Sequence, residues 1–171
     1  MSVVLEISSL KKKLIYSIRQ RSERSGTFQL EVKGTLFDPE GASVIGELGA
    51  IKLADFEFRA KVKIQGIGGL GDGAGSMATA VSLRALERGL KWAVFAGGVE
   101  TLPKGAKIIV VEDVITTGEE TLKTIERLKA EGYAPVAVLA LVDDERGAEE
   151  AFEKQGMKLL TILKHSEILE V

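Results

Sequence analysis

The segment 108–118 constrains the fold more than any other part of the sequence. It opens with Ile-Ile-Val-Val, a continuous apolar run typical of a central parallel strand that is buried on both faces. The run ends in the acid pair Glu112 and Asp113, and a Thr-Thr-Gly turn follows at 116–118. A strand that is buried on both faces needs helices on both sides of its sheet. The segment therefore predicts an α/β protein.

The rest of the chain alternates between the hydrophobic periods of helices and strands. Helices are predicted at about 8–20, 38–54, 76–88, 119–131 and 147–155, with a last turn at 166–169. Strands are predicted at 27–32, 56–64, 91–95, 108–111, 136–142 and 157–163. Segment 66–75 contains six glycines and is interpreted as a long loop. Strands that alternate with helices imply right-handed βαβ units, so the predicted fold is a doubly wound, mostly parallel sheet flanked by helices.

Composition excludes several classes of protein. The 171 residues fit one domain, and a net charge of −2 argues against broad nucleic-acid binding. The chain has no cysteine and only one histidine, His165, which excludes thiolate metal sites and argues against a histidine-based zinc site or a Ser-His-Asp triad. No apolar run has the length of about 20 residues that a membrane span requires. We therefore expect a cytoplasmic protein that binds neither nucleic acid nor membranes.

The acid pair and the turn after it suggest a ligand. Ligands of open α/β sheets bind at the carboxyl ends of the strands. A tight turn into a helix directs backbone N–H groups and the positive helix dipole into one concavity, which suits a phosphate. Carboxylates accept hydrogen bonds from vicinal hydroxyl groups. One phosphate beside one diol describes a ribose 5-phosphate, and the predicted site comprises Glu112, Asp113, Thr116, Thr117, Gly118, Glu119, Glu120 and Thr121.

Segment 109–118, Ile-Val-Val-Glu-Asp-Val-Ile-Thr-Thr-Gly, resembles the phosphoribosyl-pyrophosphate (PRPP) signature of type I phosphoribosyltransferases. The Val-Ile-Thr-Thr-Gly variant is most similar to the orotate phosphoribosyltransferases. The ten-residue signature is fairly specific, and other segments support it. These segments are 39–42, 45–48, 68–70, 78–81, 141–143 and 156–163.

The resemblance implies a single phosphoribosyltransferase-like domain over 1–171, with an N-terminal helix and a reduced hood in 1–37 and a core in 38–171. It implies that the acid pair holds the ribose hydroxyls and that 116–121 wraps the 5-phosphate. Gly68, Gly69 and Leu70 would form the pyrophosphate loop. Mg²⁺ would clamp the diphosphate, so the metal would be held only through PRPP. A nucleobase would be the second substrate, and the family pattern favours a homodimer.

The sequence departs from the family pattern at four places. The loop that carries several cations in active orotate enzymes is short here, and Lys104 is its single cation and a weak catalytic candidate. Glu119 and Glu120 follow the phosphate turn, where the family has small or hydroxyl residues. Asp144 stands where the family has an arginine that reads the carboxylate of orotate. The hood segment 33–37 is truncated. The remaining basic candidates for the base pocket are Lys33 and Arg146.

Two functions remain open from the sequence. The first is an orotate phosphoribosyltransferase-like enzyme that transfers phosphoribosyl from PRPP to a nucleobase and releases pyrophosphate. The second is a catalytically lapsed protein of the same fold that binds a nucleotide or ribose phosphate as a sensor or regulator. A weaker third possibility is a structural subunit that completes the site of another protein. The signature segment motivates the enzyme. The small number of cations in the loop around Lys104 motivates the sensor.

Overall fold

The core is a five-stranded sheet whose strands all run parallel, in the order β4-β3-β5-β6-β7. The computed structural model describes residues 3–24, 27–98 and 102–170. The strands of this sheet are β3 (Gly66–Gly69), β4 (Ala93–Ala96), β5 (Lys107–Ile115), β6 (Ala134–Asp143) and β7 (Lys158–Lys164). The predicted α/β class is confirmed.

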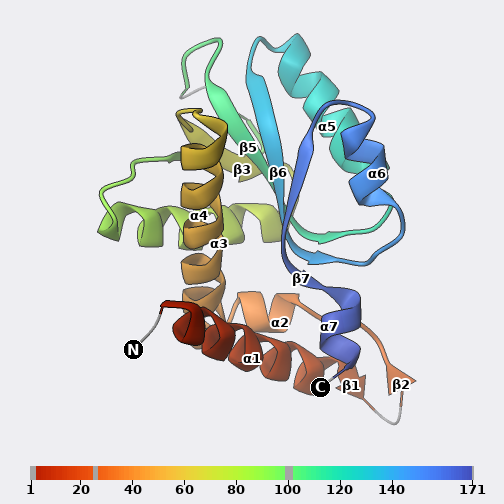
Figure 1. The fold of residues 1–171 in the computed structure, drawn as a ribbon. Helices are drawn as coiled ribbons and strands as arrows, with labels where there is room; N and C mark the ends of the chain where they lie inside the picture. The colour runs from red at the N-terminus through yellow and green to blue at the C-terminus, as the bar shows by residue number, and fades with distance from the viewer. Residues whose placement is uncertain (1–2, 25–26, 99–101, 171) are drawn as a thin grey trace.

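Helices cover both faces of this sheet (Figure 1). The helices of the core are α3 (Pro39–Ala60), α4 (Asp72–Glu87), α5 (Glu119–Ala130) and α6 (Ala148–Glu153). Residues of α3 and α4 share one hydrophobic cluster with Ile109 and Val111, whereas residues of α5 and α6 share a second cluster with Ile108 and Val110. Successive β5 side chains thus alternate between two buried faces, which is why the strand is a continuous apolar run.

The described part of the chain before Asp38 contains α1 (Val3–Ser22), β1 (Glu23–Arg24), β2 (Thr27–Phe28) and α2 (Lys33–Leu36), and we use the name hood for these four elements. β7 leads directly into α7 (His165–Leu169), which lies beside α1 (Figure 1). Lys11 of α1 and Glu167 of α7 form an ion pair of 2.7 Å. Because the five strands are parallel, their carboxyl ends therefore face the hood. None of the helices in the described ranges is long and apolar enough to cross a membrane.

The predicted strand at 56–64 is wrong, because α3 continues to Ala60. The alternation of Phe56 and Phe58 suggested a strand, but Phe56 packs in the core and Phe58 is 84% exposed on the helix. The helix ends at Lys61, which has a left-handed backbone with φ of 51°. Its predicted start is confirmed: Asp38 caps the helix by accepting a hydrogen bond from the backbone N–H of Gly41 at 3.1 Å.

The predicted loop at 66–75 is also wrong, because its first four residues form β3 and α4 begins at Asp72. These glycines are required by close packing. A Cβ at Gly68 would lie 1.9 Å from the carbonyl oxygen of Phe95 on the neighbouring strand. The predicted strand at 27–32 is likewise shorter, with only two residues paired to β1. The sequence also predicts a loop at 96–105, of which residues 99–101 lie outside the described residues.

Candidate functional site

The acid pair lies within β5, which continues to Ile115, so the loop expected directly after Val111 begins later. Side chains alternate along a strand, and the two acids therefore point to opposite faces of the sheet. Glu112 contacts α5, and Asp113 lies against the first turn of α4. Each acid thus stands beside the start of a different helix, and together they flank the carboxyl end of the central strand.

Glu112 has a strongly perturbed titration. Burial raises the pKa of its carboxyl group to about 7; a hydrogen bond from Thr121 opposes this shift, and the negative charge of Asp113 adds to it. The Thr121 hydroxyl donates to Oε1 of Glu112 at 3.2 Å, and Thr121 is itself buried. Near neutral pH this carboxyl group exists in both protonation states, so it can either accept or donate a hydrogen bond to a hydroxyl group.

Asp113 is held from two sides. The backbone N–H of Val114 donates to its Oδ1 at 2.9 Å. On the other side, a Cβ built at Gly73 would lie 2.2 Å from Oδ2, so only glycine fits there with this carboxylate in place. The carboxylate therefore has a fixed position against the N-terminal turn of α4.

The predicted phosphate turn lies at the start of α5. Thr116 and Thr117 are exposed, and Gly118 occupies the N-cap position with φ of 81°, without a side-chain cap. The first N–H groups of a helix have no partner within the helix, and the helix dipole is positive there. This turn can therefore accept a phosphate.

The two acids that follow the turn, Glu119 and Glu120, are exposed to solvent. The side chain of Glu120 is 86% exposed and pairs with Lys123 one turn along the helix at 2.6 Å. Both acids are within the first turn, where negative charge complements the helix dipole. Neither acid is buried against the turn at 116–118, and Lys123 compensates part of the charge of Glu120.

The predicted pyrophosphate segment lies beside the hood. Gly68 and Gly69 belong to β3, and Leu70 follows at its carboxyl end. A cavity of about 640 Å³ opens next to Leu70 and is bordered by Phe37 at the end of α2. The other residues that line it are Gly71, Gly75, Ser76, Thr79, Val94, Ala96 and Gly97. The glycines of β3 thus have a packing role, and the segment also borders open space between the hood and α4.

At the end of β6, the predicted base-pocket residue Arg146 is already paired. Its Nε lies 2.7 Å from Oδ2 of Asp144, whose side chain is only 9% exposed. The other oxygen of Asp144 lies 2.5 Å from Nδ1 of His165. The His165 ring stacks on Phe28 of the hood with centroids 5.7 Å apart. The second predicted base contact, Lys33, is exposed at the start of α2 in the same hood.

The sequence interpretation did not predict the stack of His165 on Phe28 or its contact with Asp144. A signal for His165 was available, since it directly follows a parallel strand whose carboxyl end reaches the ligand-binding edge of the sheet. For Phe28 the sequence offers only a single aromatic residue in a short hairpin. Its relation to His165 depends on how the hood folds over the core.

Lys104 lies away from the acid pair. Its ammonium group donates to the carbonyl oxygen of Glu131 at 2.6 Å and lies 4.4 Å from the centre of the Tyr133 ring. These contacts are at the amino end of β5, and the acid pair is roughly 15–20 Å further along the strand at about 3.3 Å per residue. The structure therefore does not bring this cation to the candidate site of its own chain. Among the described residues, no three His, Asp or Glu side chains converge on a potential metal site.

A five-stranded parallel sheet flanked by helices, with an acid-bearing central strand that leads through Thr-Thr-Gly into a helix, defines the type I phosphoribosyltransferase class. The structure is similar to that of Mycobacterium tuberculosis orotate phosphoribosyltransferase in complex with inorganic phosphate, with a TM-score of 0.77, 23% identity and coverage of 94% of this chain and 98% of the other. For the complex of the same enzyme with PRPP, the TM-score is 0.75 and the identity 25%, over 93% and 98% of the two chains. No family model matches the chain.

A sequence relative gives the particular family. The orotate phosphoribosyltransferase of Rhodopseudomonas palustris strain TIE-1 is 36% identical over 166 residues, which cover 88% of this chain and 86% of the relative. The chain therefore belongs to the orotate phosphoribosyltransferase family.

Proposed function

We propose that this protein transfers the phosphoribosyl group of PRPP to orotate and releases pyrophosphate. The observation that carries the proposal is the placement of Glu112 and Asp113 at the carboxyl end of the central strand, beside the uncapped first turn of α5. A family member with this arrangement has the groups that a ribose 5-phosphate requires. None of the comparisons favours the lapsed sensor.

In this proposal, the 5-phosphate of PRPP binds the backbone N–H groups and hydroxyls of 116–121. The acid pair receives the ribose hydroxyls. The diphosphate lies toward Gly68, Gly69 and Leu70, and a Mg²⁺ ion held by the diphosphate itself would neutralise part of its charge. Residues 1–37 cover the bound base, and residues 38–171 bind PRPP. The two parts form a single domain.

During the reaction, the bond between C1 of the ribose and the diphosphate oxygen breaks, and a ring nitrogen of the base forms the new bond to C1. The proton of that ring nitrogen passes to solvent or to the departing diphosphate. Positive charge develops on the ribose ring as the diphosphate leaves. The side chains of the site contribute mainly by positioning and by electrostatic stabilisation. The acid pair holds the ribose, and the helix start holds the phosphate at its other end.

We further propose that the protein acts as a homodimer in the cytoplasm. Only one cation, Lys104, lies between β4 and β5, and its contacts are at the amino end of β5. A departing diphosphate needs more positive charge than this loop can supply to its own site, and a second copy can supply it. The large exposed side chains Leu83 and Leu86 on α4, next to the edge strand β4, support a protein contact on this side. Light scattering coupled to size-exclusion chromatography distinguishes a dimer from a monomer.

The proposed reaction is tested by incubating the protein with PRPP, Mg²⁺ and orotate, and measuring pyrophosphate release and nucleotide formation. Uracil, adenine and hypoxanthine serve as alternative bases. We expect turnover with orotate and its loss in Asp113→Asn. PRPP binding by calorimetry without turnover on any base would overturn the enzyme and favour the sensor.

A further inference from the structure

Two adjoining cavities are bordered by α3 and the edge strand β7, and the first of them also by α1. Their volumes are about 400 and 420 Å³, within the range of about 300–1,000 Å³ that is typical of small-molecule sites. They share Lys52, Asp55 and Arg59, which are spaced three and four residues apart on one face of α3. We call the two cavities together the Lys52 groove.

The Lys52 groove is strongly cationic. Among the described residues, its lining contains the cations Lys11, Lys52, Arg59 and Lys158, against Asp55 as the one carboxylate. Lys11 pairs with Glu167 and Arg59 pairs with Asp55, each at 2.7 Å. Neither Lys52 nor Lys158 forms an ion pair with any residue in the described ranges. Positive charge in the groove is therefore only partly compensated.

Lys52 is a half-buried cation at the junction of the two cavities. Burial lowers the pKa of its ammonium group, and the positive charges of Lys11 and Lys158 lower it further, whereas the carboxylates of Glu167 and Asp55 oppose the shift. Holding such a group near like charges is unfavourable unless an anion compensates it. A bound anion would compensate the positive charges that are clustered around Lys52.

The groove also has an apolar wall. Ile7, Leu48, Ile51 and Ile162 line the first cavity next to Lys11 and Lys52. Phe56, Leu159 and Leu160 line the second, next to Lys158. An anion alone would not use this wall. A ligand that carries both an anionic group and a flat or apolar body would contact all of it.

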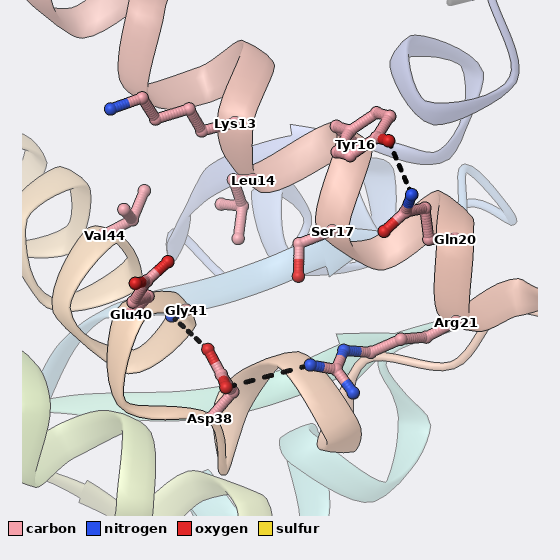
Figure 2. A pocket seen from close by; sticks show the side chains of 10 residues that line it. All are labelled: Lys13, Leu14, Tyr16, Ser17, Gln20, Arg21, Asp38, Glu40, Gly41 and Val44. Carbon is pink, nitrogen blue, oxygen red and sulfur yellow. Dashed lines mark hydrogen bonds and ion pairs between the residues drawn. The ribbon is translucent and has the colours of Figure 1, made fainter.

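A neighbouring pocket provides a contrast (Figure 2). That pocket, between α1 and the start of α3, has about the same volume of 420 Å³ but a balanced charge, with two cations and two acids. Its polar groups are largely paired within the protein: Arg21 lies 3.9 Å from Asp38, and Gln20 donates to the Tyr16 hydroxyl at 2.6 Å. The surplus of positive charge is thus a property of the Lys52 groove and does not apply to the polar pocket beside it.

We propose that the Lys52 groove is a second binding site, which accepts a phosphate-bearing ligand with an apolar or aromatic body, such as a nucleotide. The phosphates contact Lys52 and Lys158, and the base lies on the isoleucine wall. This site is distinct from the candidate active site. Lys158 opens β7 at its amino end, whereas the acid pair lies toward the carboxyl end of β5. The inference does not depend on the proposed transferase activity.

The test measures binding by calorimetry in the protein with Asp113 intact, with saturating PRPP present and no base, so that PRPP occupies the candidate active site. The probes are ATP, inorganic tripolyphosphate and adenosine. We expect ATP to bind, with an affinity that falls as salt increases. Lys52→Met should weaken this binding at least tenfold. Lys13→Met is the matched control, because Lys13 is an exposed lysine of α1 that lines the neighbouring pocket, and it should leave binding unchanged.

Lys52→Met should fold normally, because it removes a half-buried charge and keeps an unbranched side chain of similar length. Adenosine alone should bind at least tenfold more weakly than ATP, since it lacks the phosphates. The proposal is overturned if ATP does not bind at millimolar concentration, or if Lys52→Met and Lys13→Met have equal affinity. Equal binding of tripolyphosphate and ATP would overturn the role of the apolar wall.

Discussion

Gly73, in the first turn of α4, lies directly against the carboxylate of Asp113 on β5. A Cβ at this glycine would stand 2.2 Å from Oδ2 and 2.7 Å from Cγ of the aspartate. On its other side, the carboxylate accepts a hydrogen bond from the backbone N–H of Val114. The position of one acid of the candidate site thus depends on a missing side chain in a segment 40 residues away.

Gly73→Ala should displace Asp113 and weaken PRPP binding by at least tenfold. The clash involves the carboxylate together with its Cβ, 3.0 Å away, so rotation of the side chain alone does not relieve it. Calorimetric titration with PRPP and Mg²⁺ measures the effect. Gly71→Ala is the control, because a Cβ there meets nothing within 4 Å. Equal PRPP affinity in the two variants would show that Asp113 does not hold the ribose.

Glu112 should make the free energy of unfolding fall as the pH rises. Its pKa is about 7 in the folded protein and near the ordinary 4.5 when unfolded. Between these values the folded state holds a proton that the unfolded state releases, so stability is lost from about pH 4.5 up to about pH 7. The loss is roughly 3–4 kcal/mol at most, since one pKa unit corresponds to about 1.4 kcal/mol.

Glu112→Gln should flatten this dependence and be more stable than the unmodified protein at pH 7.5. Urea unfolding at pH 5 and pH 7.5 measures the difference for each protein. Glu120→Gln is the control, because that side chain is exposed and should leave the dependence as it is. An unchanged slope in Glu112→Gln would contradict the burial that raises this pKa.

Gly118→Ala should disturb both the stability and the phosphate turn. Its φ of 81° is unfavourable for a residue with a side chain by about 1–2 kcal/mol, and a Cβ would press on the Phe152 ring at 3.1 Å. Gly147, the N-cap of α6, is a matched control with φ of 94° and no contact closer than 3.7 Å. Both alanine variants should lower the melting temperature, Gly118→Ala by more. Only Gly118→Ala should weaken PRPP binding, and equal weakening in both would contradict the cradle at 116–118.

The sequence predicted the sheet well because its strands carry strong local signals. β5 and β6 are long apolar runs, and their class follows from burial on both faces. The segment 56–64 was predicted as a strand because Phe56 and Phe58 alternate, but a helix can also place Phe56 in the core and Phe58 in solvent. The glycines of β3 led to a wrong prediction of a loop. Glycine is needed there because a neighbouring strand and helix pack closely against the backbone. Such a contact between distant segments leaves no local pattern.

In the predicted site, too, the residues that are contiguous in sequence were predicted together, whereas contacts between distant segments were not. The acid pair and the turn at 116–118 are contiguous in sequence, and the structure brings them to one end of β5. Lys104 is near the signature in sequence, but it contacts Glu131 and Tyr133 at the other end of the strand. His165, Asp144 and Phe28 come from three distant segments, and only the folded chain places them together.

Asp144→Asn should improve the use of orotate. The carboxylate of Asp144 pairs with Arg146 and adds negative charge at the end of β6, on the edge of the sheet where the proposal places an anionic base. An asparagine keeps a hydrogen-bonding partner for His165 and releases the guanidinium group of Arg146. We expect the KM for orotate to fall by about three- to tenfold at saturating PRPP, in line with about 1 kcal/mol for one charged contact.

Steady-state kinetics at fixed pH measure this change, with Glu149→Gln as the control. Glu149 is an exposed acid of α6 whose nearest cation, Lys164, is 3.8 Å away, so its charge is screened and its loss should leave the KM unchanged. A KM for orotate that rises in Asp144→Asn would mean that the acid itself contacts the base. The pairing of Asp144 with Arg146 would then orient a group that receives the substrate directly.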